Sequence, residues 1–281
     1  MKKTLVFLFI SPQFVIAATT TIDVGGTSII IPYPKGFVPV TAEFVTLKKV
    51  LDSLTPSTNK RFSSFIDEKQ MGQVLGDEVP ALVRTFNVQT SRRDINALIT
   101  NTDFGRLKEF LKKDLSDLMK QVEKEIPGIV DQLNKNIEKQ FDIDMGLKIA
   151  NMVPLPVHEE SDRSVSYSVF AKQQFSGEKG ETEIYVSVST ITMVHVKGKL
   201  LSLYCYGDHS DLQWSRQNTN EWTEAIIAAN PSDFGTAIQE TVPVLGGINW
   251  AKVLEKAMIG AIVGAVIGLL GYLIKRKKKS V

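Results

Sequence analysis

The fold is decided by the stretch Glu183–Tyr206, which reads EIYVSVSTITMVHVKGKLLSLYCY. Apolar and polar residues alternate through its first half, and Lys197–Gly198 has the composition of a tight turn before a second apolar run. We therefore expect two antiparallel strands joined by a hairpin. The apolar side of the first strand changes near Thr190, which predicts either a β-bulge or a strand buried on both faces.

The residues before this hairpin predict further strands and one short helix. Gly25–Gly26 forms the turn of an N-terminal hairpin, because alternating residues flank it. Thr41 can cap a short helix that ends before Pro56. Strands are expected over residues 61–66 and 81–89.

A helical segment is expected over residues 103–141, with an interruption at Pro127–Gly128. Its first part is amphipathic, and such a face packs more often on the chain's own sheet than on a partner helix. The apolar stripe consists of Leu107, Leu111, Leu115, Leu118, Val122 and Ile126. A closing helix is expected from Asn220, as its cap, to residue 229.

Residues 1–17 have the pattern of a secretory signal peptide. Lys2 and Lys3 supply a positive start, an apolar stretch follows, and Val15 and Ala17 are small enough for a cleavage site. An uncleaved N-terminal anchor is the alternative. We expect the mature chain to be exported.

The C-terminal region has the pattern of a membrane anchor. Ala257–Ile274 contains eighteen residues without a charge, and the basic cluster 275–279 follows directly. At 1.5 Å per residue this run covers about 27 Å, close to the hydrocarbon thickness of a bilayer. A juxtamembrane and transmembrane helix is therefore predicted over 250–274, after a linker at 231–249. The positive-inside rule places the basic tail 275–281 in the cytoplasm.

Two groups of residues refine this anchor. Membrane-interface positions are expected at Trp250, Lys256, Tyr272, Lys275 and Arg276. Gly260, Gly264 and Gly268 recur every four residues on one helical face, which indicates helix–helix packing in a homo-oligomer. Two alternatives remain: glycine is common in membrane helices, and a glycine-zipper oligomer acting on the membrane itself would carry the same stripe.

The overall charge conceals an acidic domain. The formal charge of +2 includes seven cations in Lys2, Lys3 and the tail, so residues 4–274 carry −5. An acidic domain argues against a nucleic-acid partner. Cys205 is the one cysteine, which excludes a disulfide framework and favours a buried core thiol. The lack of disulfides and glycan acceptors fits a bacterial periplasm, although Lys278–Lys279 also resembles a eukaryotic retrieval tail.

Candidate chemistry is sparse. The sequence contains no phosphate-binding glycine loop, no nucleophile elbow and no zinc-protease motif, and no cofactor is expected. Two acidic clusters carry histidine, and they could hold a divalent cation if they met in space. Their candidate ligands are His158, Glu159, Asp208, His209 and Asp211. Solvated loops are the commoner explanation, and a metal-dependent or hydrolytic periplasmic enzyme is the alternative.

Other polar or aromatic residues in the late strands have two interpretations each. His195 lies in the middle of a strand and is expected to be packed or at an edge, without a role as a general base. Trp214 could line a ligand groove with Tyr204 and Tyr206, or pack in the core.

The order of elements resembles the PsbP-like α/β/α fold. The likeness lies in Pro34-x-Gly36-Phe37, the hairpin around Lys197–Leu200 and the helix carrying Trp222, and it covers about residues 20–230. It implies an accessory or binding protein without catalytic activity. The helical segment around Pro127 and the C-terminal anchor depart from that pattern.

Together these features predict an α+β protein with a mostly antiparallel sheet packed with helices, plus one C-terminal transmembrane helix. The periplasmic domain spans residues 18–230, and the chain is expected in the bacterial inner membrane as a single-pass protein. We expect an interaction or accessory module with an unidentified periplasmic partner.

Overall fold

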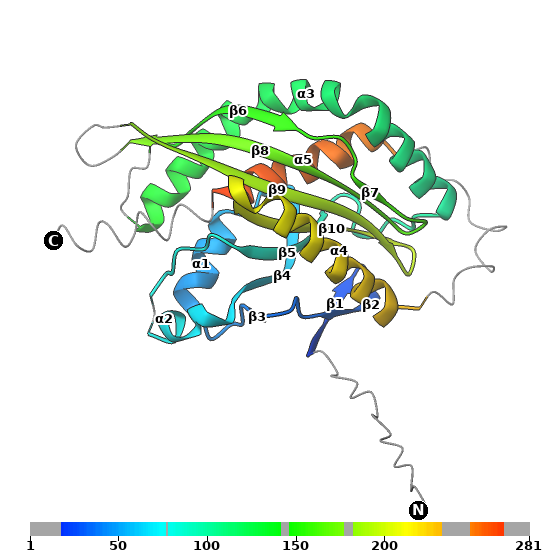
Figure 1. Cartoon of the computed structure of the whole chain (residues 1–281), viewed down its shortest axis with the longest axis horizontal. Coiled ribbons are helices and arrows are strands. Elements are labelled where there is room, and N and C mark those ends of the chain that lie inside the picture. The colour runs from blue at the N-terminus through cyan, green and yellow to red at the C-terminus, as the bar shows by residue number, and fades with distance from the viewer. Residues whose placement is uncertain (1–17, 77, 142–145, 177–181, 232–247, 267–281) are drawn as a thin grey trace, which may run out of the picture.

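The computed structural model describes residues 18–76, 78–141, 146–176, 182–231 and 248–266 (Figure 1). Its centre is an antiparallel eight-stranded sheet in the order β3-β4-β5-β10-β9-β8-β6, with β7 also paired to β8. The strands are β3 (Phe37–Pro39), β4 (Asn59–Asp67), β5 (Thr85–Ser91), β6 (Lys148–Pro154), β7 (Glu159–Glu160), β8 (Ser164–Ser176), β9 (Thr182–Val196) and β10 (Lys199–Asp208). The predicted N-terminal hairpin is confirmed as β1 (Thr19–Val24) and β2 (Thr27–Pro32).

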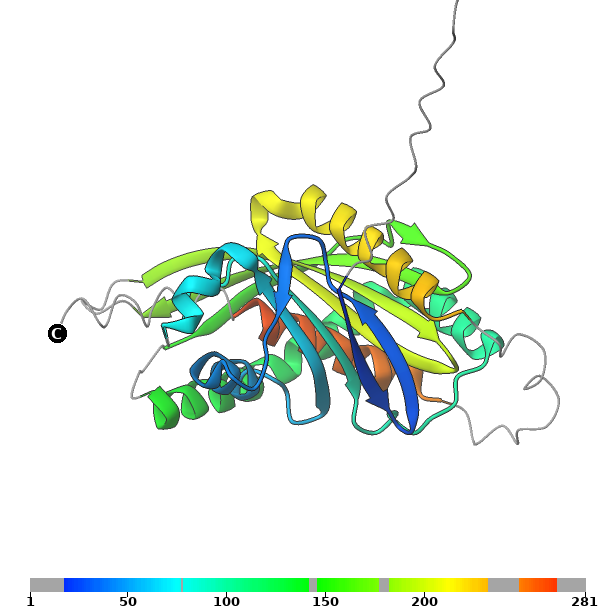
Figure 2. The ribbon, with the colours of Figure 1, turned by 90° about the horizontal axis from the view of Figure 1, so that it is seen from below.

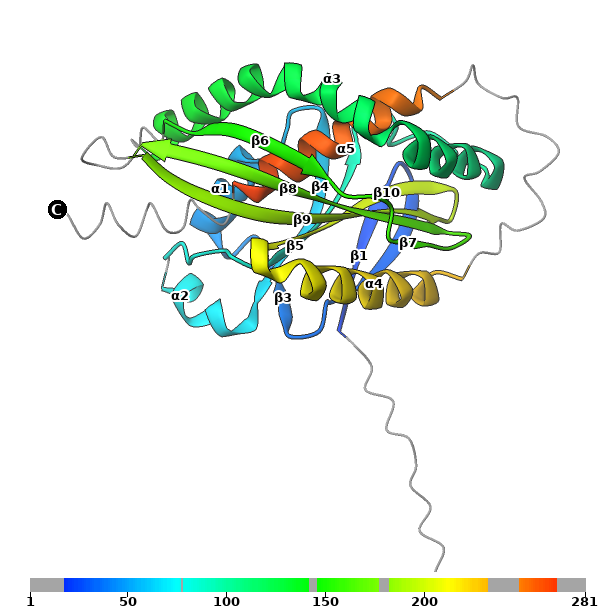
Figure 3. The ribbon, with the colours of Figure 1, turned by 45° about the horizontal axis from the view of Figure 1, so that its top comes forward.

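Helices cover both faces of the sheet (Figures 1 and 2). One face carries α4 (Leu212–Ala229), which also packs on the hairpin strand β2. The other carries α1 (Val45–Ser53), α3 (Asn101–Phe141) and α5 (Trp250–Ala265), and α5 contacts both the sheet and α3 (Figure 3). The short helix α2 (Met71–Leu75) and 3-10 turns at Glu68–Gln70 and His209–Asp211 complete the described elements.

The central hairpin forms as predicted. Lys197 and Gly198 both have positive φ, 48° and 73°, as a two-residue hairpin turn requires. β9 keeps an uninterrupted register with β8 and β10, and every residue from Ser187 to Val196 is buried. The change of apolar side near Thr190 therefore reflects burial on both faces, and the alternative of a bulge is wrong there.

Alternation along β10 separates two cores. Leu201, Leu203 and Cys205 face α4, whereas Tyr204 and Tyr206 belong to the core beneath α3 and α5. The prediction of a buried Cys205 is confirmed. Burial also raises the pKa of the Cys205 thiol, so the group stays protonated.

The long helix differs from its prediction at Pro127. α3 continues through this residue, which lies exposed inside the helix. The apolar stripe continues on the far side through Val130, Leu133 and Ile137, all buried in the same core. Burial of this stripe offsets the one backbone hydrogen bond that proline removes.

The helix boundaries also differ from prediction. α4 begins at Leu212, not after Asn220, because Asp208 and Asp211 form a capping box that starts the helical turn earlier. The side chain of Thr41 does not cap α1, whose N-cap residue is Phe44. The buried face of α1 consists of Leu47, Val50 and Leu51.

The largest difference lies at the C-terminus. Residues 250–265, expected to lie apart from the domain in a membrane, form α5 and pack in the larger core. Among the residues that the structure describes, no helix has both the length and the apolarity needed to cross a bilayer. The predicted signal peptide, most of the linker, and Gly268, Tyr272, Lys275 and Arg276 lie outside the described residues.

Candidate functional site

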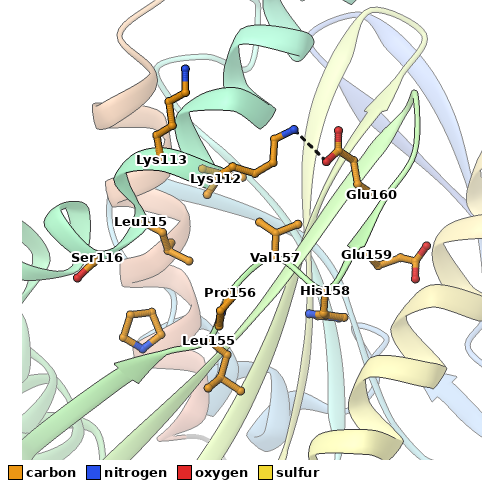
Figure 4. Close-up of a pocket in the computed structure, with 12 residues that line it drawn as sticks. Lys112, Lys113, Leu115, Ser116, Leu155, Pro156, Val157, His158, Glu159 and Glu160 are labelled. Carbon is orange, nitrogen blue, oxygen red and sulfur yellow. Dashed lines mark ion pairs between the residues drawn. The ribbon is translucent and has the colours of Figure 1, made fainter.

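A cavity of about 680 Å³ lies between α3 and the segment 154–160, and His158 lines it (Figure 4). Its lining combines the apolar side chains of Leu111, Leu115 and Val157 with charged side chains from α3 and β7. Lys112 points toward Glu160 there, with 3.3 Å between the ammonium and the carboxylate. The cavity is mixed in character and has room for a small molecule.

The His158 ring is held neutral. Burial lowers its pKa to about 4, and the positive charge of Arg216 acts in the same direction. Its Nδ1 atom is buried and has no hydrogen-bond partner among the described residues. Glu160 is already paired with Lys108, at 3.1 Å, and with Lys112. The cations around this histidine therefore make the cavity unfavourable for a metal ion.

The second predicted cluster has a structural role. The Asp208 carboxylate accepts hydrogen bonds from the backbone N–H and hydroxyl of Ser210, both at 3.0 Å, and lies 2.9 Å from His209 Nδ1. The Asp211 carboxylate receives two hydrogen bonds from the guanidinium of Arg84, at 2.6 and 3.2 Å. These acids cap a helix and form an ion pair.

The two histidine clusters do not meet. The backbone N–H of His158 donates a hydrogen bond to Ser166 O on β8. Asp208 on β10 pairs with Ser187 on β9, which in turn pairs with Ala171 on β8. Five residues of β8 separate these positions, or about 16 Å at 3.3 Å per residue. The described residues contain no group of three or more side chains placed to hold a metal. Glu159 is exposed on β7. The enzyme alternative thus lacks the shared cleft on which it depended.

Two other predicted positions are packed in the protein. His195 Nε2 lies 2.8 Å from Ile99 O, and its ring stacks on Phe104. Trp214 lies on the α4 face, where the Arg84 guanidinium sits 4.4 Å from its ring centroid. The hypothesis of one groove shared by Trp214, Tyr204 and Tyr206 is wrong, because the tyrosines face the opposite side of the sheet.

Four polar side chains hold α5 on the sheet, and we define these residues, Asn59, Ser189, Tyr204 and Tyr206, as the seat of α5. Each of these side chains donates a hydrogen bond to a backbone carbonyl of α5. Asn59 donates to Lys256 O and Ser189 donates to Ala261 O, both at 3.2 Å. Tyr204 donates to Ala257 O and Tyr206 donates to Gly260 O, both at 3.0 Å. Burial raises the pKa of both tyrosines, so they remain donors.

Glycine permits this close approach. A Cβ added at Gly260 would lie 2.6 Å from Tyr204 Oη, and one at Gly264 would overlap the ring and hydroxyl of Tyr206. The two tyrosine rings are nearly parallel, with centroids 5.9 Å apart, and their hydroxyl ends meet the helix. Within the chain, these two glycines therefore serve helix–sheet packing. Their predicted helix–helix role remains a prediction.

The start of α5 is charged and tied to α3. Glu255 is 3% exposed and pairs with Lys252 at 2.8 Å and with Lys256. Lys256 also lies 3.5 Å from Glu125 on α3. It is half-buried in the described structure, as is Trp250.

Sequence reasoning missed the seat. The available signal was the pair Tyr204 and Tyr206 on one face of a strand that also buries its other face. A buried tyrosine hydroxyl needs a polar partner, and an apolar helix offers only its backbone carbonyls.

Comparisons with known proteins give little further information. No protein-family model matches the chain, and no curated protein does. The solution structure of cyanobacterial PsbP (CyanoP) from Synechocystis sp. PCC 6803 is 12% identical, covers 78% of this chain and 95% of its own, and has a TM-score of 0.28. The Ran-binding protein Mog1p of Saccharomyces cerevisiae is 10% identical over 76% of this chain and 90% of its own, also with a TM-score of 0.28. Such scores carry no argument about function, and the mixed α+β class rests on the sheet and helices described above.

Proposed function

We propose that this chain is a non-catalytic accessory module of the bacterial inner membrane, exported by residues 1–17 and directed to the bilayer by residues 250–274. The observation that carries the proposal is the surface of α5. Every residue from Val253 to Ala265 is buried except the half-buried Lys256, and residues 257–265 carry no charge, so this part of the helix is apolar around its whole circumference. Helices of this kind are found in protein cores or in membranes.

The seat and the bilayer would compete for the same residues. The uncharged run begins at Ala257, and residues 257–265 of it lie in α5. If the run spans a membrane, these residues must leave the seat. The proposed module therefore has two states, one with α5 in the seat and one with it in the bilayer.

The two states differ in free energy by a balance of opposing contributions. The apolar surface of α5 is removed from water in both, so the hydrophobic stabilisation of the helix itself is common to them, whereas the apolar groove beneath it is covered only in the seated state. Leaving the seat breaks four hydrogen bonds, at about 0.5–1.5 kcal/mol each. Lys and Arg near an anionic membrane surface contribute about 1 kcal/mol each in the opposite direction. The basic residues 275–279 are well suited to supply this electrostatic attraction to the membrane surface.

Release of α5 would also create an interaction surface. The vacated groove would expose the donors of the seat and the apolar side of α3. A helix with small residues four positions apart fits this groove, as Gly260 and Gly264 do. The partner that we propose is α5 of a second copy, which would give the predicted homo-oligomer without helix pairing in the membrane.

The test is vesicle flotation of the full chain carrying Tyr204→Phe and Tyr206→Phe. These changes remove two donors of the seat while keeping the rings. We expect a larger vesicle-bound fraction and faster hydrogen exchange in α5. A matched variant with Tyr33→Phe and Tyr185→Phe removes two hydroxyls away from the seat and should behave as the parent. Equal bound fractions for the two double variants would contradict the two-state proposal.

The compartment needs a separate test. Protease added to spheroplasts that express the full chain should digest the α+β domain, since we propose that it faces the periplasm. A domain that is digested only after lysis would refute the proposed localisation.

A further inference from the structure

A second cavity, of about 380 Å³, lies where the turn after β5 meets the first turns of α5. Arg92 and Arg93 contribute from the turn, and Lys252 and Lys256 from the helix. Asp94 is the one acidic residue in its described lining. The volume lies within the range of small-ligand sites.

The positive charge of this cavity is only partly balanced. Lys252 and Lys256 share the buried Glu255, and Lys256 also meets Glu125. Arg92 and Arg93 are both exposed, and neither has an ion-pair partner within the described part of the chain. Among the cations of the lining, the two arginines are therefore the ones without an ion pair in the described structure, and Asp94 is the acidic residue that shares the lining with them.

Like charges also face each other across the cavity. Arg93 and Lys252 come from different elements, yet they are close enough for the arginine to oppose protonation of the lysine. The Glu255 carboxylate outweighs this repulsion, and the pKa of Lys252 is raised overall. An anion between the two cations would replace their repulsion by two attractions.

We propose that this cavity binds a phosphate group, with Arg92, Arg93 and Lys252 as its cationic contacts. The planar guanidinium groups match the oxygens of a phosphate in a bidentate manner, and the ammonium adds a point charge. The direction of the α5 dipole favours negative charge at the same end of the helix, although the Asn249 side chain already accepts from Lys252 N–H at 3.1 Å. A free phosphate compound and a phospholipid headgroup share this chemistry.

The site is complete only while α5 is seated. Arg92 and Arg93 belong to the turn after β5 and Lys252 belongs to α5, so withdrawal of the helix would divide the site. Binding a phosphate would then stabilise the seated state by linkage. This consequence depends on the two-state function proposed above, whereas the binding site itself does not.

The test uses the full chain with Arg92→Gln and Arg93→Gln, against a control with Lys135→Gln and Lys139→Gln on the exposed side of α3. Both double variants remove two positive charges. Pyrophosphate binding by calorimetry should weaken at least about tenfold in the arginine variant and remain near the parent value in the control. Equal losses in both variants would show a general charge effect and overturn the site.

Vesicle flotation identifies the source of the phosphate. Vesicles of phosphatidylcholine, with or without phosphatidylglycerol, are floated with each variant. Binding to the anionic vesicles that depends on the arginines and is displaced by pyrophosphate identifies a headgroup. Pyrophosphate binding without such a dependence identifies a soluble phosphate compound.

If the parent chain binds neither probe, the proposal is wrong. Tyrosine variants that leave vesicle binding unchanged would contradict the two-state function alone, and arginine variants that leave phosphate binding unchanged would contradict this site alone.

Discussion

Helices α4 and α5 pack on opposite faces of one sheet by different physical means. The α4 face is built from side-chain contacts, with Trp222 packed edge-on against Phe65 and Phe86 at centroid distances of 5.6 and 5.2 Å. The α5 face combines apolar packing in the larger core with four side chains that donate hydrogen bonds to the backbone of the helix. Helix α4 is amphipathic and has a solvent-exposed side, whereas α5 has none along most of its length. The packing of α4 fits that helix to one protein surface only. The side chains of α5 are apolar on most sides, so they are suited to lipid as well as to the seat.

The largest expected effect is on the α4 face. Trp222→Ala removes the aromatic contacts and the hydrogen bond from Trp222 Nε1 to Pro32 O, 2.8 Å long. We expect about 3–5 kcal/mol of destabilisation in urea unfolding. Gln213→Ala, at an exposed position of the same helix, should change stability by less than about 0.5 kcal/mol. A loss below 1 kcal/mol for Trp222→Ala would show that the aromatic contacts of Trp222 do not hold α4 on the sheet.

The next effect should separate the two faces. Gly264→Leu places a side chain against the ring of Tyr206, and overpacking of this kind costs about 1–3 kcal/mol. We expect α5 to lose hydrogen-exchange protection while α4 keeps it, with an increase in vesicle binding. Ala251→Leu, at a half-buried position in the first turn of α5, serves as the control. Equal loss of protection in both helices would show that α5 cannot leave without global unfolding.

A pH effect is expected beside α3. The pKa of His158 is lowered to about 4 in the folded state, below its ordinary value of 6.5. The folded protein therefore binds fewer protons than the unfolded chain between these values, and stability falls as the pH decreases from 6.5 to 4. His158→Gln should lose less stability than the parent over this range. Unfolding curves of identical pH dependence for the two proteins would contradict the burial of the neutral ring.

The smallest expected effect concerns a single bond of the seat. Ser189→Ala removes the hydrogen bond to Ala261 O and should cost about 0.5–1.5 kcal/mol. Ser187→Ala is the control at a neighbouring position, because its hydroxyl accepts a bond from Gln173 instead. The Ser189 variant should raise vesicle binding slightly and the Ser187 variant should not. An increase for both would assign the effect to the stability of β9 in general.

Local patterns were sufficient for part of this fold. The hairpins at Gly25–Gly26 and Lys197–Gly198 follow from turn residues whose backbone conformations only a few residue types adopt. The buried face of α3 follows from the spacing of its apolar residues. The strands β6 and β8 were not predicted, although Val165, Tyr167 and Val169 alternate in the sequence and are buried.

The candidate site depended on contacts between distant segments. No local pattern shows that Asn59, Ser189, Tyr204 and Tyr206 converge on one helix, because they come from three different strands. The same limitation applies to His158 and Asp208. Both lie in acidic, histidine-containing segments and were candidate ligands of one cation, but the register of the sheet places them apart.

By itself, the sequence determined that Ala257–Ile274 cannot remain in water, because an uncharged run of this length must be buried in protein or lipid. It also determined the central hairpin and the buried cysteine. Only the tertiary structure decided where residues 257–265 are buried. A seat of hydroxyl and amide donors exists only after β4, β9 and β10 pair, and hydrogen bonds to backbone carbonyls leave no signature in the sequence of the helix that accepts them.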